Sequence, residues 1–201
     1  MEIKENNVYC IDAREGFKLL KNKSVDLILT DPVYSTAGMI TYKILSENVN
    51  RVLKESGVLV AEVGRGYFLP NIFKIMEDSS LEFGGVLVDY LSHLRFTNKP
   101  NLKDSFFISL LYFKDRRYLF DYNCIYSVKG KNSLNKEFYH WEKDLDMYEH
   151  YIKSFTNEGD LIVDPFCGSG SVLVACKKLN RRYIGFDRLS GCVEMAKKRL
   201  I

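Results

Sequence analysis

Short apolar runs alternate along the chain with amphipathic stretches. Six stretches are predicted as strands, the last being a pair that forms one βαβ unit: Val8–Asp12, Val25–Thr30, Gly57–Val63, Phe83–Val88, Phe106–Phe113, and Leu161–Asp164 with Arg182–Phe186. Several runs are continuously apolar, which is typical of central strands covered on both faces. Helical patterns lie between them, at Ala13–Leu20, Tyr42–Leu53, Pro70–Met76, Leu145–Phe155, Gly170–Leu179 and Cys192–Leu200. This alternation predicts a doubly wound α/β sheet.

The length of 201 residues suits one compact domain, so we expect residues 1–201 to form a single unit. The least regular stretches are Ser92–Asn101 and Asp121–Trp141, which are predicted as loops and short elements. No apolar run approaches the roughly 20 residues of a membrane helix. Met1 is followed by Glu2 and Lys4 rather than by an apolar stretch, so no signal peptide is expected. These features predict a cytoplasmic protein.

The cysteines are odd in number and scattered, at Cys10, Cys124, Cys167, Cys176 and Cys192. None form the close pairs of a structural zinc site or a redox motif, so no metal site is predicted. Reduced thiols in a cytosolic protein are expected, and Cys10, Cys124 and Cys176 are predicted as core residues rather than catalysts.

The net charge is only +3, but its distribution is uneven. The segment from Ser92 to His140 contains nine Lys and Arg against four acids, so it is basic on a slightly acidic body. Such a segment is the expected electrostatic footprint for a polyanion such as DNA, and Arg116 and Arg117 are its candidate phosphate contacts. The alternative is that this pair caps the end of a strand and faces solvent or a carboxylate such as Asp115.

A glycine-rich turn between two strands is the strongest motif in the chain. The run Leu161-Ile-Val-Asp-Pro-Phe-Cys-Gly-Ser-Gly170 ends a buried strand at Asp164 and turns into a helix. A second strand then ends in an acid at Asp187. On a Rossmann-like sheet this arrangement indicates nucleotide recognition, with the second acid accepting hydrogen bonds from ribose hydroxyls. The third glycine of dinucleotide sites is missing, so no pyrophosphate cradle is implied.

A second motif, Asp31-Pro32-Val33-Tyr34, follows the strand Val25–Thr30. Open α/β sheets place their active sites at the carboxyl ends of strands, which is where these residues fall. The tetrapeptide offers a hydrogen-bond acceptor, a rigid turn and an aromatic ring. That combination suits a planar base that carries an amine.

Together these segments resemble the S-adenosylmethionine-dependent DNA amino-methyltransferases of restriction–modification systems, bacteria and phages, in the permuted order in which the catalytic motif precedes the cofactor motif. The residues that carry the resemblance are Val8–Asp12, Ser24–Tyr34, Glu142-Lys143 and Leu145–Leu200. The resemblance implies a circularly permuted, Rossmann-like, seven-stranded class I methyltransferase sheet. It also implies S-adenosyl-L-methionine as cofactor and DNA as partner.

The resemblance also implies roles for individual residues. Asp164 and the turn with Phe166, Gly168 and Gly170 would hold the methionine end of the cofactor, and Asp187 the ribose hydroxyls. Asp12 would lie near the cofactor adenine, and Lys143 would belong to the segment that precedes the cofactor motif. In catalysis, an extruded base would present its amine to the Asp31 carboxylate and the Pro32 carbonyl while Tyr34 stacks on its ring.

Asp at the first position of the catalytic motif favours N6 of adenine over N4 of cytosine in this family. Val33 departs from the family, which usually has a second proline there; valine frees one φ angle and adds a backbone N–H. Methylation of cytosine N4, methylation of RNA, and a degenerate methyltransferase that serves as a binding or specificity subunit stay open as alternatives.

Residues 92–140 are the natural place for target recognition, and a dedicated recognition domain usually needs more chain than these 49 residues. Three arrangements are therefore open. The protein reads few bases, forms a homodimer, or borrows its specificity from a partner.

Overall fold

A computed structural model describes residues 2–33, 38–64, 68–96, 103–118, 125–128 and 145–201 of the chain. The strands are β1 (Asn7–Cys10), β2 (Val25–Thr30), β3 (Leu53–Gly64), β4 (Glu82–Phe96), β5 (Lys103–Phe113), β6 (Ile125–Val128), β7 (Leu161–Asp164) and β8 (Arg182–Asp187). The α-helices are α1 (Ala13–Leu19), α2 (Met39–Val52), α3 (Leu69–Met76), α4 (Leu145–Phe155), α5 (Ser171–Lys178) and α6 (Ser190–Arg199). Short 3₁₀ turns are η1 (Glu77–Ser79) and η2 (Arg116–Tyr118).

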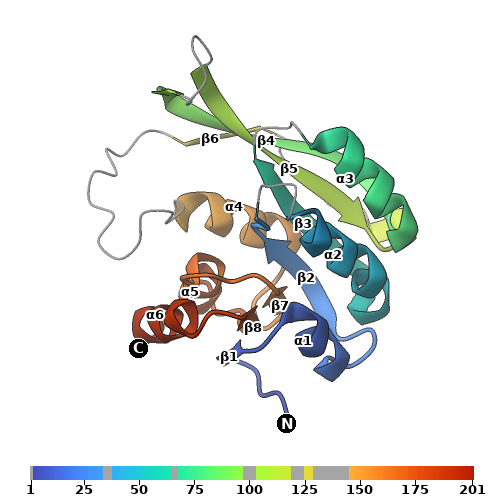
Figure 1. The fold of residues 1–201 in the computed structure, drawn as a ribbon, viewed down its shortest axis with the longest axis vertical. Helices are drawn as coiled ribbons and strands as arrows, with labels where there is room; N and C mark the ends of the chain where they lie inside the picture. The colour runs from blue at the N-terminus through green and yellow to red at the C-terminus, as the bar shows by residue number, and fades with distance from the viewer. Residues whose placement is uncertain (1, 34–37, 65–67, 97–102, 119–124, 129–144) are drawn as a thin grey trace.

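Within the described residues, eight strands form one mixed sheet in the order β1-β8-β7-β2-β3-β5-β4-β6 (Figure 1). Neighbours from β1 to β3 are parallel, β5 is antiparallel to both β3 and β4, and β6 is parallel to β4. The carboxyl ends of β1, β8, β7, β2 and β3 therefore lie at one edge of the sheet.

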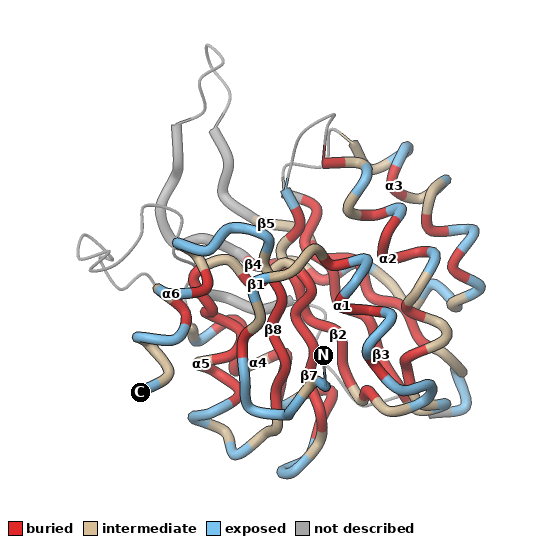
Figure 2. Tube along the Cα trace, turned by 60° about the horizontal axis from the view of Figure 1, so that its bottom comes forward, coloured by how far each residue is buried: buried red, intermediate tan, exposed pale blue. Residues whose placement is uncertain are grey.

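The helices cover both faces of this sheet, which makes three layers (Figure 1). Buried residues of α4, α5 and α6 pack on one face, and those of α1, α2 and α3 pack on the other. Side chains alternate between faces along a strand, so Leu27 and Leu29 join the first cluster while Ile28 joins the second. All three are fully buried, and each such side chain contributes about 1.5–3 kcal/mol on burial. Figure 2 shows the strands as the buried centre of the molecule.

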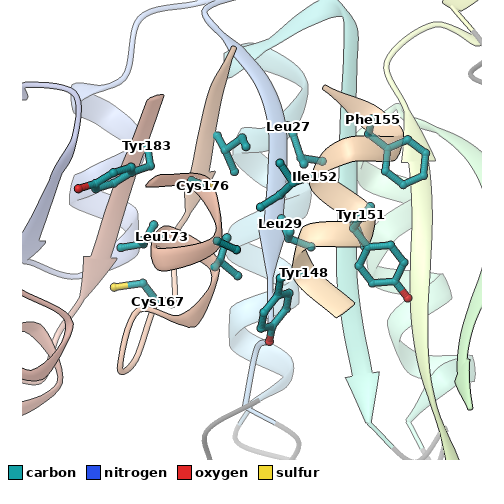
Figure 3. Close-up of a cluster of buried hydrophobic side chains, with 14 of the residues drawn as sticks. Leu27, Leu29, Tyr148, Tyr151, Ile152, Phe155, Cys167, Leu173, Cys176 and Tyr183 are labelled. Atoms are coloured by element: carbon teal, nitrogen blue, oxygen red, sulfur yellow. The ribbon is translucent and has the colours of Figure 1, made fainter. Parts of the chain in front are cut away.

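The helix α4 shows why the amphipathic pattern determines local structure here. Its inward positions recur at helical spacing and are buried, at Met147, Tyr148, Tyr151, Ile152 and Phe155. The tyrosines and Phe155 extend from the helix into the cluster that covers β2 (Figure 3). The bounds of this helix are those predicted from the sequence.

The predicted α/β fold of class I methyltransferase type is confirmed, but several strands differ in number or bounds from the prediction. The sheet has an eighth strand, β6, in a stretch that the sequence predicts to contain loops and short elements. In addition, β4 and β5 extend beyond their apolar runs, with Arg95 paired to Asp104 and Phe96 to Lys103. Such pairing depends on contacts between strands rather than on a local apolar run, so the sequence pattern does not indicate it.

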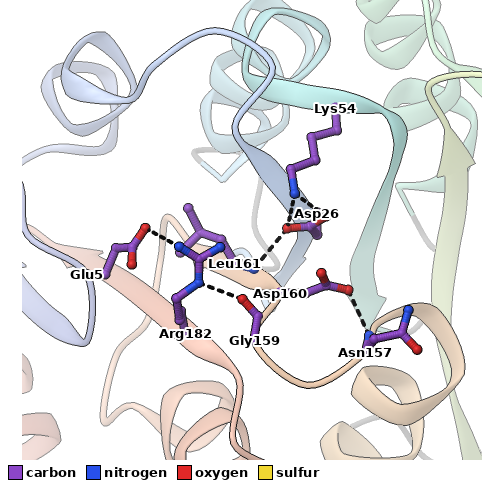
Figure 4. Close-up of polar contacts among 8 residues, drawn as sticks. All are labelled: Glu5, Asp26, Lys54, Asn157, Gly159, Asp160, Leu161 and Arg182. Atoms are coloured by element: carbon purple, nitrogen blue, oxygen red, sulfur yellow. Dashed lines mark hydrogen bonds and ion pairs between the residues drawn. The ribbon is translucent and has the colours of Figure 1, made fainter.

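A polar network joins the strand starts at the edge opposite the carboxyl ends (Figure 4). The Lys54 ammonium donates to both carboxylate oxygens of Asp26 at 2.7 and 2.8 Å, and the Leu161 amide donates to the same carboxylate at 2.9 Å. Arg182 donates to the Gly159 carbonyl at 2.6 Å and to Glu5 at 2.7 Å. These contacts tie β2, β3, β7 and β8 together away from the candidate site.

Candidate active site

Acidic residues gather at the carboxyl edge of the parallel strands. Asp164 ends β7 and Asp187 ends β8. Asp31 follows the last residue of β2, and Asp12 lies two residues beyond Cys10, which pairs with Asp187. Because parallel strands end at a common edge, the structure brings together four acids that the sequence motifs contain.

The turn between β7 and α5 needs glycine at two places. Gly168 and Gly170 have φ of +49° and +81°, which side chains rarely tolerate. A Cβ on Gly170 would also lie 2.8 Å from the Ala196 Cβ of α6. The Cys167 amide donates to the Phe186 carbonyl at 2.9 Å, which ties the turn to β8. Backbone amides of the turn are thereby held at the edge where the acids lie.

Asp187 is tied to the same turn through its side chain. Its Oδ2 accepts a hydrogen bond from the Gly168 amide at 3.0 Å, and its Oδ1 accepts one from the Leu189 amide at 2.8 Å. A carboxylate has about four acceptor positions, so capacity remains for ligand hydroxyls. The position fits the role in ribose binding that the sequence predicts.

Asp164 is a buried carboxyl group with only 3% of its surface exposed. Its Oδ1 accepts hydrogen bonds from the Thr30 hydroxyl at 2.7 Å and from the Phe166 amide at 3.1 Å. Burial raises its pKa to about 7, since these two hydrogen bonds only partly offset the loss of solvent. The group is therefore suited to binding a cation, which would stabilise its charged form.

Asp31 and Pro32 lie directly after β2, with Pro32 buried and Val33 exposed at 62%. Thr30, the last residue of β2, is the donor to Asp164, so the catalytic and cofactor motifs meet through one hydrogen bond. Tyr34, the predicted stacking residue, lies outside the described residues. So does Lys143.

Asp12 is better described as a helix cap than as a strand end. It is the N-cap of α1, and its Oδ1 accepts a hydrogen bond from the Arg14 amide at 2.9 Å. Its carboxylate also lies 3.5 Å from the Arg14 guanidinium. The predicted strand Val8–Asp12 therefore ends earlier, at Cys10. Asp12 instead starts the helix, since an Asp at the N-cap accepts a hydrogen bond from a backbone amide that has no partner within the helix.

Two further residues contact this edge and belong to neither predicted site. Thr30 contacts Asp164, as described. Glu62 is fully buried on β3 and accepts a hydrogen bond from the Tyr148 hydroxyl at 2.8 Å. Glu62 could have been found from the sequence because it is a charged residue inside the apolar run of β3. Burial of a charged group is costly at such a position unless the group is hydrogen-bonded.

Arg199 of α6 forms hydrogen bonds with residues at the start of α5. Its guanidinium donates to the Ser169 carbonyl at 2.9 Å and to the hydroxyls of Ser169 and Ser171 at 3.1 Å. The glycine-rich turn is thus supported from α6 as well as from β8.

The two buried cysteines among the described residues are poorly suited to act as nucleophiles. Cys176 is buried in the core as predicted, and burial raises the pKa of the Cys167 and Cys176 thiols well above the usual value. Cys10 is exposed, so its prediction as a core residue is wrong, and Cys124 lies outside the described residues. Among the described residues, no group of His, Cys, Asp and Glu could hold a metal ion.

The candidate phosphate contacts Arg116 and Arg117 lie beyond the end of β5. Because Phe113 of β5 pairs with Val58 near the start of β3, this is the edge opposite the acids. The Arg117 guanidinium forms an ion pair with Asp115, and Arg116 contacts Glu82 and the Phe83 carbonyl. These contacts favour the alternative, in which the pair caps a strand and faces a carboxylate.

The edge as a whole presents a glycine-rich turn tied to Asp187, the buried acid Asp164 and, directly after the neighbouring strand β2, Asp31. This arrangement fits the α/β methyltransferase fold that the sequence predicts. A family model described as "DNA methylase" (N6_N4_Mtase) matches residues 91–198, and the chain belongs to this family of DNA amino-methyltransferases. The cofactor of the family is S-adenosyl-L-methionine, as the sequence predicts.

Individual relatives agree with this assignment. The chain is 29% identical to Type II methyltransferase M.HpaI of Haemophilus parainfluenzae over 241 positions, which cover 98% of this chain and 74% of that relative. It is 40% identical to Type II methyltransferase M.BamHI of Bacillus amyloliquefaciens over 76 positions, but these span only 38% of this chain and 17% of that protein.

Solved structures show the same fold. The crystal structure of the M1.HpyAVI–SAM complex has a TM-score of 0.78 at 23% identity, covering 96% of this chain and 98% of that one. PvuII DNA methyltransferase, described as cytosine-N4-specific, has a TM-score of 0.83 at 15% identity, covering 100% of this chain and 88% of that one.

No helix in the described ranges is long and apolar enough to cross a membrane.

The role of Asp187 can be measured directly. Asp187→Ala removes a charged acceptor, and hydrogen bonds to charged groups are worth roughly 1.5–3 kcal/mol. We expect the dissociation constant for S-adenosylmethionine to rise about ten-fold or more in calorimetry. Glu194→Ala, an exposed acid on α6, serves as the control and should bind normally. Unchanged affinity in a folded Asp187 variant would remove this residue from the cofactor site.

Proposed function

We propose that the protein transfers a methyl group from S-adenosylmethionine to N6 of adenine in DNA. The observation that carries this proposal is a hydrogen bond between the strands that precede the two motifs. Thr30, at the end of β2, donates to Asp164, at the end of β7, at 2.7 Å. A base held at Asp31 would therefore lie one strand away from the cofactor turn.

The residues at this edge fit the cofactor. S-adenosylmethionine supplies an electrophilic methyl group on a sulfonium centre, and it carries an ammonium and ribose hydroxyls. The buried Asp164 carboxyl suits the ammonium, because a cation offsets the cost of its ionisation. Asp187 and the amides of the turn at Gly168 suit the ribose side.

Catalysis would depend on Asp31 and Pro32. Their carboxylate and carbonyl would accept hydrogen bonds from the target amine, which directs the nitrogen lone pair toward the methyl group. Tyr34 would stack on the extruded base. Positioning and local electrostatics then supply the rate enhancement without a covalent enzyme intermediate.

The choice of adenine rests on Asp31 as the first residue of the catalytic motif. The direct test is to incubate the purified protein with labelled S-adenosylmethionine and plasmid DNA, digest the DNA and identify the modified nucleoside. N6-methyladenine supports the proposal, whereas N4-methylcytosine supports the same reaction on the other base. Cofactor binding without transfer to DNA or RNA would indicate a degenerate binding or specificity subunit.

We further propose that the protein acts in restriction–modification or as a related bacterial or phage methylase, with target recognition by residues near 92–140. Part of that segment belongs to β4, β5 and β6, so not all of its residues are available for reading bases. A homodimer or a separate specificity partner would supply the rest.

The basic residues at the far edge give a test of where DNA binds. Because Arg116 and Arg117 already contact Glu82 and Asp115, we expect their joint replacement by Ala to leave the salt dependence of DNA affinity unchanged. Each lost phosphate contact would instead lower the log–log slope by about 0.9 on duplex DNA. Binding titrations at several salt concentrations measure this slope. A decrease of this slope by about one to two units, by the same counterion estimate, would show that these arginines contact DNA.

A further inference from the structure

Glu62 is a charged residue of β3, which lies beside β2, the strand that leads to Asp31. The register of β2 and β3 pairs Thr30 with Ala61, so Asp31 and Glu62 follow these partners on adjacent strands. Val58 and Val60 face α4, and side-chain alternation places Glu62 on that same face. Its side chain is fully buried.

Two tyrosines from opposite layers hold Glu62 in place. The Tyr148 hydroxyl of α4 donates to its Oε1 at 2.8 Å, and the Tyr42 hydroxyl of α2 donates to its main-chain carbonyl at 2.5 Å. A buried carboxylate costs several kcal/mol unless its lone pairs are satisfied, and an apolar side chain would cost less there. The fold thus keeps a fixed carboxylate at a position where packing alone favours an apolar residue.

Tyr148 contacts Glu62 directly and is also influenced by the charges of two further acids. Burial is the main reason why the pKa of its hydroxyl is well above the usual value, and the nearby charges of Glu62, Asp31 and Asp164 raise it further. Tyr148 extends from α4 beside β2 at the boundary of the core cluster (Figure 3). Because Thr30 pairs with Ala61 and donates to Asp164, Glu62 lies one strand away from the position where both acids begin.

The reacting sulfonium must lie in this neighbourhood if the proposed function is correct. The target amine is held at Asp31 and the cofactor lies along the turn after Asp164, so the transferred methyl group bridges the space between them. Reacting atoms approach to roughly 3–3.5 Å before transfer. When the methyl group leaves, the electrons of the C–S bond stay on sulfur, and the amine later releases a proton. The cofactor thus changes from a cationic sulfonium to a neutral thioether.

We propose that Glu62, fixed by Tyr148, attracts the sulfonium charge and so makes the site prefer S-adenosylmethionine over its product S-adenosylhomocysteine. This inference rests on the proposed function and adds a residue that neither sequence motif contains. The charge lost on transfer weakens the attraction by Glu62, which favours release of the product.

The test is to measure the dissociation constants of S-adenosylmethionine and S-adenosylhomocysteine separately for the whole chain. Glu62→Gln keeps the acceptor for Tyr148 and the side-chain volume but removes the charge. For a charge within about 8 Å of the sulfonium at a protein-like dielectric, we expect the preference for the cation to fall at least about ten-fold. Binding of the neutral product should change much less.

Glu149→Gln is the matched control. Glu149 is also a largely buried glutamate, on the same helix as Tyr148, but its carboxylate forms ion pairs with Lys178 and Lys153. Removal of its charge should leave the ratio of the two dissociation constants as in the wild type. Tyr148→Phe is the second variant, for use if Glu62→Gln does not fold. It removes the hydrogen bond from the Tyr148 hydroxyl to Glu62, so the preference should fall in the same direction by a smaller factor.

The outcomes separate the inference from the function on which it rests. An unchanged ratio in folded Glu62→Gln overturns the inference, and so does an equal loss of affinity for both ligands, which would indicate a structural role. If Glu62→Gln does not fold, an unchanged ratio in Tyr148→Phe has the same meaning. A wild-type protein that binds neither ligand overturns the proposed function itself, and the inference with it.

Discussion

Asp31→Ala is expected to abolish methyl transfer to DNA while leaving the affinity for S-adenosylmethionine nearly intact. Asp31 is assigned to the amine of the target base, so its removal takes away an acceptor that acts where charge develops in the transition state. Loss of one such group typically lowers kcat by about 10²–10³-fold. The measurement is incorporation of labelled methyl groups into DNA, with cofactor affinity determined in parallel by calorimetry.

Two further variants define the meaning of that result. Asp31→Asn keeps a neutral acceptor and should retain more activity than Asp31→Ala, since only the charge is lost. Glu47→Ala removes an exposed acid on α2 and should be fully active. If Asp31→Ala is as active as the wild type, the catalytic role of this motif is wrong. If its cofactor affinity falls in step with its activity, Asp31 belongs to the cofactor site instead.

The arrangement of strands and helices could be predicted because the signal for it is local. The central strands contain short apolar runs, and α4 carries its apolar residues at helical spacing. The same holds for the acids at Asp164 and Asp187, since a strand, a glycine turn and a second strand determine their positions from nearby sequence. Parallel strands with helical crossovers then place both acids at one edge.

The parts that escaped prediction depend on contacts between distant residues. Thr30 and Asp164 are 134 residues apart in sequence, and Glu62 and Tyr148 are 86 apart, yet both pairs form buried hydrogen bonds. No periodicity indicates which hydroxyl will meet which carboxylate. The strand β6 is similar, because its four residues are held by pairing with β4 rather than by an apolar run of their own. Residues near catalytic acids are therefore found from the fold, not from motifs.

The carboxyl edge as a whole is more acidic than stability alone would favour. Asp164 and Glu62 are both buried there, and each is held by hydrogen bonds from hydroxyl groups or backbone amides. Buried acids without a cation destabilise the folded state, whereas a bound cation stabilises them. The free energy of folding and the affinity for the cofactor should therefore change in opposite directions when such a charge is removed.

Asp164→Asn should show this opposition most clearly. The hydrogen bonds from Thr30 and Phe166 both reach Oδ1 of Asp164, so an asparagine oxygen can accept them in the same way. The variant lacks only the charge and the proton. At about pH 8 we expect it to bind S-adenosylmethionine at least ten-fold more weakly than the wild type, on the estimate of roughly 1.5–3 kcal/mol for a charged hydrogen bond.

The same substitution is expected to stabilise the protein without cofactor, in a way that depends on pH. The pKa of Asp164 is about 7 in the folded protein, against about 3.9 for an unfolded Asp. Between these values the folded state binds more protons than the unfolded state, so the wild-type free energy of unfolding falls as pH rises from about 4 to about 7. The asparagine side chain of the variant does not titrate. The advantage of Asp164→Asn should grow through that window and reach about 4 kcal/mol above it.

Urea unfolding at about pH 5 and about pH 8, combined with cofactor titrations over the same range, measures both effects. Wild-type affinity should rise with pH until Asp164 is ionised near neutrality, because the cation binds the charged carboxylate, whereas the variant should show weak and constant affinity. Asp26→Asn is the matched control. Asp26 is paired with Lys54 at 2.7 Å, so removal of its charge should lower the free energy of unfolding, whereas Asp164→Asn should raise it. If the wild type showed no pH dependence and Asp164→Asn bound the cofactor normally, the Asp164 carboxylate would not be facing the cofactor's charge. The cation would then have to be held by the other acids of this edge, Asp187 and Glu62.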